Sequence, residues 1–299
     1  MGLAWQQGPL APRAAGTFLV SEPLPARLLY AEPLRRRMGV IFGGQSIAES
    51  DDVVLLHEPA RYPVAYFPRS SILRSALVAT DKRTNHPDLG EMTWFEVNGG
   101  DRSVPRGAWE HTALPPFARV LEDHVAFAWH AMDGFYEEAE RIVGHAADFY
   151  HRIDIRRSAR HVAVRSQGTQ LAETDRAIVL YESGFAPRWY VPRSDIGDGL
   201  LTPVQRETFC PYKGICSYYD AGEAHRAAWA YLQPYREVNR IDGYVSFEPD
   251  KVEVTIDHQR LEPEPGQHVV SHGPDRSLAT DEAGTEALPE SLRPIGASA

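Results

Sequence analysis

The chain has 299 residues, a formal net charge of −10 at pH 7 and an isoelectric point near 5.6. Because nucleic-acid binding needs a concentrated basic surface, this acidic balance argues against a nucleic-acid partner. Its two cysteines are too few for a cysteine-based zinc site, and no apolar stretch approaches the roughly 20 residues that cross a bilayer. We therefore expect a cytoplasmic protein that needs no metal, cofactor or membrane. Arginine far outnumbers lysine, as is typical of a GC-rich bacterial genome.

The first half of the chain begins with an arm and continues into a β-rich domain. Residues 1–27 are rich in proline, alanine and glycine, so we expect an arm that is ordered only where it packs on another surface. The first domain is expected at residues 28–143. Within it, apolar residues flank Gly43 and Gly44, and this pair favours a tight β-hairpin because glycine accepts positive φ.

Further strands and a few short helices complete the expected elements. An aromatic strand is predicted at residues 63–67 and a late strand at 125–129. Short helices are predicted at residues 116–123, 135–143 and 234–240, the second because Glu137 to Glu140 are good helix formers.

The second half repeats this organisation. A linker is expected at residues 144–157, a second domain at 158–262 and a tail at 263–299, whose Pro, Glu, Gly and Ser content prevents it from forming its own core. A period-two pattern at 160–165 and an apolar run at 177–182 predict further strands.

The two domains are copies of each other. Tyr66-Phe67-Pro68-Arg69-Ser70 returns as Tyr190-Val191-Pro192-Arg193-Ser194, at an offset of 124 positions. After a four-residue deletion the register resumes, so that Ala108-Trp109 matches Ala228-Trp229. Similarity over about a hundred residues indicates a duplicated domain rather than a small stacking repeat. The fold class is therefore mainly β with minor helices, in two small antiparallel domains.

The segment from Thr208 to Tyr219, with the Tyr190 strand before it and Trp229 after it, resembles the bacterial domain-of-unknown-function 427 family. The resemblance covers about residues 28–260, and it implies curved sheets of the Mss4-like or β-tent type, here without zinc-binding cysteine pairs. A nucleotidyltransferase-like label is sometimes attached to this family. The chain lacks the Gly-Ser pair, the spaced acidic pair and the glycine-rich phosphate loop of such enzymes, so nucleotidyl transfer is not expected.

The sharpest candidate for chemistry is the turn Cys210-Pro211-Tyr212-Lys213-Gly214. A lysine beside Cys210 favours the thiolate, and a desolvated Lys213 is itself a candidate nucleophile. The alternative interpretation is a buried small residue beside a surface charge. The first copy keeps the proline and glycine but has His86 in the position of Cys210. His86 is therefore a proton shuttle in a diverged site, a contributor to a shared cleft, or a partly exposed loop residue.

Other candidates are retained in both copies. Glu58 and Glu182 end apolar strands, while Arg69 and Arg193 follow the aromatic strands. Each carboxylate and guanidinium is expected either to form a structural ion pair or to line a pocket that binds an anion and moves a proton. The aromatic residues Tyr190, Tyr218 and Trp229 are core residues or ligand contacts, and the Tyr218 hydroxyl is a candidate acid.

Three functional hypotheses follow. The first is an enzyme without a redox cofactor that acts on a small anionic or carbonyl-bearing metabolite in the second repeat. In it Lys213, Cys210, Glu182 and Tyr218 are catalytic and Arg193 binds the anion, with Tyr190, Trp229, Arg69, Glu58 and His86 as further contacts. The second is a non-catalytic module that binds a small molecule or a nucleotide. The third is an assembly protein, and a homodimer through the arm or the tail is expected.

Overall fold

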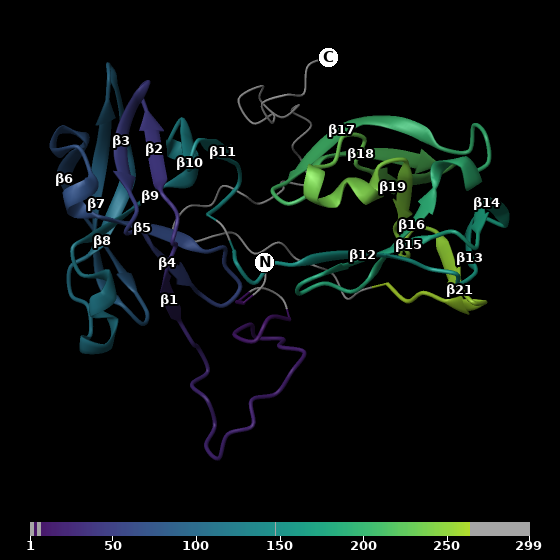
Figure 1. Cartoon of the computed structure of the whole chain (residues 1–299), viewed down its shortest axis with the longest axis horizontal. Helices are drawn as coiled ribbons and strands as arrows, with labels where there is room; N and C mark the ends of the chain where they lie inside the picture. The colour runs from purple at the N-terminus through teal and green to yellow at the C-terminus, as the bar shows by residue number, and fades with distance from the viewer. Residues whose placement is uncertain (1–2, 5–6, 147, 264–299) are drawn as a thin grey trace. The chain divides into compact units, whose positions relative to one another are not determined.

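A computed structural model describes residues 3–4, 7–146 and 148–263 (Figure 1). The chain divides into two compact units between Tyr150 and His151, and each unit contains one repeat. All strand pairings between named strands are antiparallel in the described part of the chain, which confirms the mainly β, duplicated fold expected from the sequence.

The first repeat has two sheets. The strand order of the seven-stranded sheet is β1 (Tyr30–Pro33), β4 (Val54–His57), β5 (Val64–Pro68), β9 (His124–Phe127), β8 (Arg102–His111), β7 (Gly90–Gly99) and β6 (Leu77–His86). The four-stranded sheet runs β11 (Glu140–Ile142), β10 (Gly134–Glu137), β2 (Met38–Phe42) and β3 (Gln45–Ser50). The helices are short 3₁₀ turns: η1 (Arg69–Ser71), η2 (Arg74–Ala76), η3 (Pro116–Leu121) and η4 (Trp129–Ala131).

The second repeat reproduces both sheets strand for strand. Its seven-stranded sheet runs β12 (Ile153–Arg157), β15 (Ile178–Glu182), β16 (Arg188–Pro192), β20 (Tyr244–Phe247), β19 (Ala224–Ala230), β18 (Gly214–Ala221) and β17 (Thr202–Cys210). The smaller sheet runs β14 (Thr169–Thr174), β13 (Val162–Ser166), β21 (Glu253–Ile256) and β22 (Gln259–Arg260), and the 3₁₀ turns are η5 (Arg193–Asp195) and η6 (Arg236–Ile241). The strand registers agree with the offset of 124 residues, since Leu55 pairs with Ala65 and Val179 with Trp189.

The alternation of side chains along these strands gives each repeat two cores, one on each face of its large sheet. In the first repeat Phe67 packs between the two sheets, whereas Tyr66 faces a second cluster that contains Trp94 and Trp109. In the second repeat Val191 and Tyr190 divide in the same way. Neighbouring residues of one strand therefore belong to different chemical environments.

The structure corrects one expected helix, confirms one expected hairpin and places a strand in part of the expected linker. The predicted helix at 135–143 is wrong, because these residues form β10 and β11, and Glu138 takes a positive φ of 52° in the turn between them. Pairing with β2 outweighs the local helix propensity. The Gly43-Gly44 hairpin is confirmed, with φ angles of 59° and 72°. Ile153–Arg157 of the expected linker forms β12 and pairs with β15.

Part of the N-terminal arm packs on the first repeat itself. Ala4 and Ala11 are buried, and the carbonyl of Ala4 accepts a hydrogen bond of 2.7 Å from the backbone N–H of Ala60. Leu19 further along the arm is exposed. Nearly all of the expected tail, residues 264–299, lies outside the described residues, and a dimer through either terminus stays a prediction.

Candidate functional site

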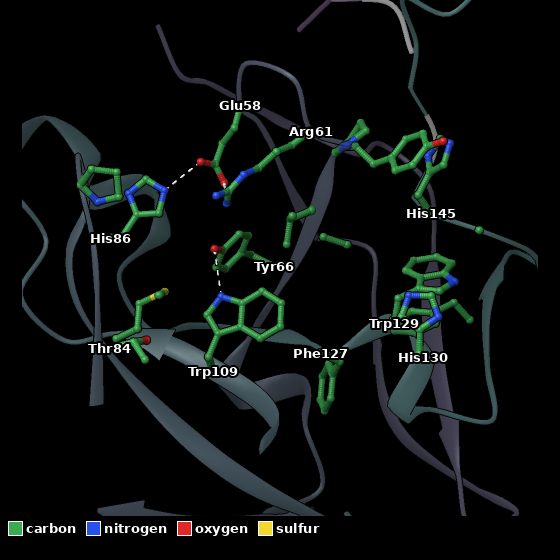
Figure 2. A pocket seen from close by; sticks show the side chains of 18 of the residues that line it. Glu58, Arg61, Tyr66, Thr84, His86, Trp109, Phe127, Trp129, His130 and His145 are labelled. Carbon is green, nitrogen blue, oxygen red and sulfur yellow. Dashed lines mark hydrogen bonds and ion pairs between the residues drawn. The ribbon is translucent and has the colours of Figure 1, made fainter. Parts of the chain in front are cut away.

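A cavity of about 310 Å³ lies in the first repeat, where β5 begins and β9 ends (Figure 2). Its lining comes from both faces of the large sheet, since Ala65 and Phe127 belong to one core cluster and Tyr66 and Trp109 to the other. The remaining lining residues are Glu58, Arg61, Tyr62, Pro63, Val64, Thr84, Asn85, His86, Pro87, Met92, Trp129, His130, Phe135, Gly144 and His145. Such a lining, mostly apolar with a few polar groups, is typical of small-molecule sites.

One end of the cavity contains a buried carboxylate. Glu58 Oε2 lies 2.8 Å from His86 Nε2, and Glu58 Oε1 accepts a hydrogen bond of 3.3 Å from Arg61 Nη1 (Figure 2). Arg27 Nη2 lies 3.6 Å from Glu58 Oε2. Burial alone would raise the pKa of Glu58, but the His86 hydrogen bond and the charges of Arg61 and Arg27 together hold that pKa below its usual value. Glu58 is therefore an ionised, fully paired carboxylate.

The hairpin between β6 and β7 fixes the tautomer of His86. Its Nδ1 accepts hydrogen bonds of 3.1 Å from the backbone N–H groups of Asp88 and Leu89. Nδ1 therefore carries no hydrogen, and in the neutral ring Nε2 is the donor to Glu58. This arrangement holds His86 as a fixed donor rather than as a mobile proton carrier.

A second polar group lies beside Glu58 and is built from β5 and β8. Trp109 Nε1 donates to the Tyr66 hydroxyl at 3.3 Å, and that hydroxyl lies 3.1 Å from His111 Nε2. Burial raises the pKa of Tyr66 well above its usual value and lowers the pKa of His111 to about 4. Both side chains are consequently neutral at pH 7.

The other end of the cavity is aromatic. Trp129 stacks on Phe135 with ring centroids 3.8 Å apart, and Tyr62 stacks on His145 at 3.9 Å. Figure 2 shows Trp129, His130 and His145 together at this end, away from Glu58 and His86. Stacked pairs of this kind present ring edges and faces that suit a flat apolar molecule.

The second repeat pairs the equivalent carboxylate differently. Lys213 Nζ donates to Glu182 Oε2 at 2.6 Å, and His151 Nε2 lies 3.1 Å from Oε1. His151 occupies the register position of Arg27, and it stacks on Tyr212 with ring centroids 3.6 Å apart. The two repeats therefore neutralise one buried carboxylate with different cations.

In the second repeat, a void of about 10 Å³ lies at positions equivalent to one end of the cavity. It is lined by Arg188 and Trp189, which stand where the first repeat has Val64 and Ala65. The guanidinium of Arg188 lies over the Trp229 ring at 5.8 Å. Two larger side chains thus occupy the space that Val64 and Ala65 leave open.

The structure brings most of the second-repeat candidates together. Glu182 binds Lys213, and Cys210, Tyr190, Tyr218 and Trp229 belong to one cluster on that face of the sheet. Arg193 lies apart from them. Its guanidinium stacks at 4.9 Å on Tyr219, which belongs to the cluster on the opposite face.

Arg69 behaves like Arg193. It pairs with Glu110 and stacks on Phe95 at 5.0 Å, on the face opposite Tyr66. Neither arginine lies beside its repeat's buried glutamate, since each begins the 3₁₀ turn after the aromatic strand and stacks on a ring of the opposite face. In contrast, His86 and Glu58, which the sequence linked only loosely, form a direct pair.

Three reactive side chains of the second repeat, those of Lys213, Cys216 and Tyr218, are held in unreactive protonation states. Burial alone would lower the pKa of Lys213, but neighbours that include Glu182 raise it above the usual value, so the amine stays protonated. Burial raises the pKa of the Cys216 thiol to about 12 and that of Tyr218 to about 12. These shifts oppose nucleophilic chemistry at neutral pH.

Several residues of the first-repeat site were not singled out from the sequence, namely Arg61, Ala65, His111, Trp129 and His145. The internal alignment contained two signals: Ala65 is aligned with the much larger Trp189, and His111 is aligned with Tyr231. Within the described residues, no group of three His, Cys, Asp or Glu side chains is placed to hold a metal ion. No helix in that part of the chain has the length and apolar character needed to cross a membrane.

The fold and this site together define a duplicated antiparallel β protein with an open cavity in one copy, where the other copy has larger side chains at two of the lining positions. A family model described as domain of unknown function DUF427 matches residues 30–138 and again residues 154–258. The chain belongs to this family and contains its domain twice. No curated protein sequence is significantly similar to the chain.

Proposed function

We propose that the first repeat is a binding module for a small, flat, mostly apolar molecule, and that the second repeat is its structural counterpart. The observation that carries this proposal is the cavity of about 310 Å³ lined by Trp109, Phe127 and Trp129. Its volume lies at the lower end of the usual range for ligand pockets, which favours a ligand of one or two rings.

The chemistry of the lining favours binding over catalysis. Glu58 is ionised and paired with His86 and Arg61, so it is a weak base and no acid at neutral pH. The lining contains no serine, cysteine or lysine that could act as a nucleophile. In the second repeat, Lys213 and Cys216 are held protonated. The binding alternative therefore has more support than an enzyme centred on Lys213.

The charge of the lining favours a small molecule over a nucleotide. Phosphate groups are usually held by several cationic or backbone N–H donors. The cavity is lined by one arginine, Arg61, which is paired with Glu58, and by no lysine. The rest of the surface is largely aromatic and aliphatic.

The second repeat suggests a variant that tests the proposal, because it shows which larger side chain the equivalent backbone position accepts. The variant Ala65→Trp introduces the residue found at position 189. We expect ethylbenzene and naphthalene to bind the wild-type chain in ligand-observed NMR titrations, and this binding to be lost in Ala65→Trp. The matched control is Ala79→Trp, on the exposed part of β6 in the same sheet.

Two results would contradict the proposal. One is that neither probe, nor any member of a set of one- and two-ring compounds, binds the wild-type chain. The other is that Ala65→Trp, folded by its amide spectrum, binds as tightly as Ala79→Trp does.

A further inference from the structure

The hydrogen bonds among Trp109, Tyr66 and His111 leave one hydrogen unused. The indole N–H, the phenol O–H and one N–H of the neutral imidazole are the available donors. Trp109 donates to the Tyr66 oxygen, and a single hydrogen joins Tyr66 to His111 Nε2. His111 Nδ1 has no hydrogen-bond partner among residues 3–4, 7–146 and 148–263. One donor therefore stays unpaired whichever tautomer His111 adopts.

The tautomer decides where the unpaired donor lies. If His111 carries its hydrogen on Nε2, it donates to the Tyr66 oxygen. The Tyr66 O–H is then free to donate to a molecule in the cavity, which Tyr66 lines. If the hydrogen is on Nδ1, the unpaired N–H belongs to His111, which is buried and does not line the cavity. Because an unpaired buried donor is unfavourable, an acceptor oxygen in the cavity stabilises the first tautomer.

Arg61 offers a second donor at the same end of the cavity. Its Nη1 donates to Glu58, and its other guanidinium N–H groups make no hydrogen bond within the described part of the chain. Its side chain is 30% exposed, so it lies at the opening rather than in the interior. A guanidinium in this position favours a carboxylate over a neutral oxygen.

We propose, on the basis of the binding function argued above, that the cavity selects aromatic molecules that carry a carbonyl or carboxylate oxygen. The Tyr66 hydroxyl donates to this oxygen, Arg61 adds a preference for the carboxylate, and the ring lies against Trp109, Phe127 and Trp129. The second repeat keeps the tyrosine as Tyr190 but has Phe185 and Tyr231 in the positions of Arg61 and His111, so it lacks the guanidinium donor and the histidine that orients the tyrosine hydroxyl.

Three single-ring probes of similar size test the inference on the full chain: benzoate, acetophenone and ethylbenzene. We expect acetophenone and benzoate to bind the wild type about tenfold more tightly than ethylbenzene does, because each makes one additional hydrogen bond with a buried donor. Tyr66→Phe should remove the advantage of acetophenone and leave the affinity for ethylbenzene within about twofold. Arg61→Gln should weaken benzoate binding alone. Tyr190→Phe in the second repeat is the matched control and should change none of the three.

Each outcome bears on one claim. Equal affinities of acetophenone and ethylbenzene for the wild type, or an equal loss of both in Tyr66→Phe, would overturn the inference. If Ala65→Trp abolishes binding of all three probes and acetophenone has no advantage, the binding function stands and the selectivity inferred here fails. If none of the three binds the wild type, the selectivity inferred here fails, and the binding function fails with it when naphthalene and the other one- and two-ring compounds do not bind either.

Discussion

At the scale of single residues, His111 makes the first repeat sensitive to acid in a way that the second is not. Burial lowers the pKa of His111 to about 4, from about 6.5 in an unfolded chain. A base whose pKa falls on folding contributes stability above its unfolded pKa, and this contribution is lost as the pH falls from 6.5 towards 4. The equivalent residue of the second repeat, Tyr231, does not titrate in this range.

Replacing His111 with glutamine should remove part of this acid sensitivity. Between pH 7 and pH 5 we expect the wild-type first repeat to lose about 2 kcal/mol of stability through His111, and the His111→Gln variant to retain that amount. Amide exchange of β5 and β9 reports the free energy of opening at each pH. His225→Gln, at an exposed position of the second repeat, is the control. If the free energy of opening depends on pH in the same way in His111→Gln as in the wild type, the lowered pKa of His111 is contradicted.

At the scale of elements, strands β5 and β16 show how one position decides between an open and a filled space. Trp189 in β16 packs against the core of the second repeat, and the guanidinium of Arg160 lies 5.4 Å from its ring centroid. Trp189→Ala should destabilise the second repeat by about 3 kcal/mol, since it leaves a cavity that the backbone does not close. Exchange rates of β16 and β20 measure this loss, while those of β5 and β9 serve as the internal control. A loss below about 1 kcal/mol would show that Trp189 fills no space.

The elements also show what the sequence could predict. Period-two alternation and the offset of 124 residues were enough for most strands and for the duplication. These two signals did not predict the strands formed between Phe135 and Ile142, where pairing with β2 outweighs helix propensity. The cavity depends on the small side chains of Val64 and Ala65, and no sequence motif indicates an unfilled volume. The separation of Arg193 from Lys213 depends on the turn η5, whose direction the sequence pattern does not specify.

At the scale of the whole molecule, each repeat has its own sheets and its own cores, so each should fold alone. The boundary matters, because β12 supplies the buried Ile155 and His151 lies beside Glu182. A fragment of residues 151–263 should unfold cooperatively on heating, as followed by circular dichroism. A fragment of residues 158–263 should not, because it lacks β12 and leaves β15 without its partner. Equal cooperativity of the two fragments would contradict this division.

Glu58 and Glu182 have different ion-pair partners, and this difference affects whether the two halves of the duplicated gene can exchange sequence. Suppose that recombination copied residues 208–214 over residues 84–90. The hybrid would gain a lysine near Glu58, where Arg27 and Arg61 already lie, and would lose Asp88, which binds Arg27 at 2.9 Å. The reverse exchange would replace Lys213 beside Glu182 with leucine, bring a histidine to position 210 and add an aspartate at position 212. Both hybrids change the charge balance around a buried carboxylate, so natural selection against misfolding should keep the two halves from being homogenised.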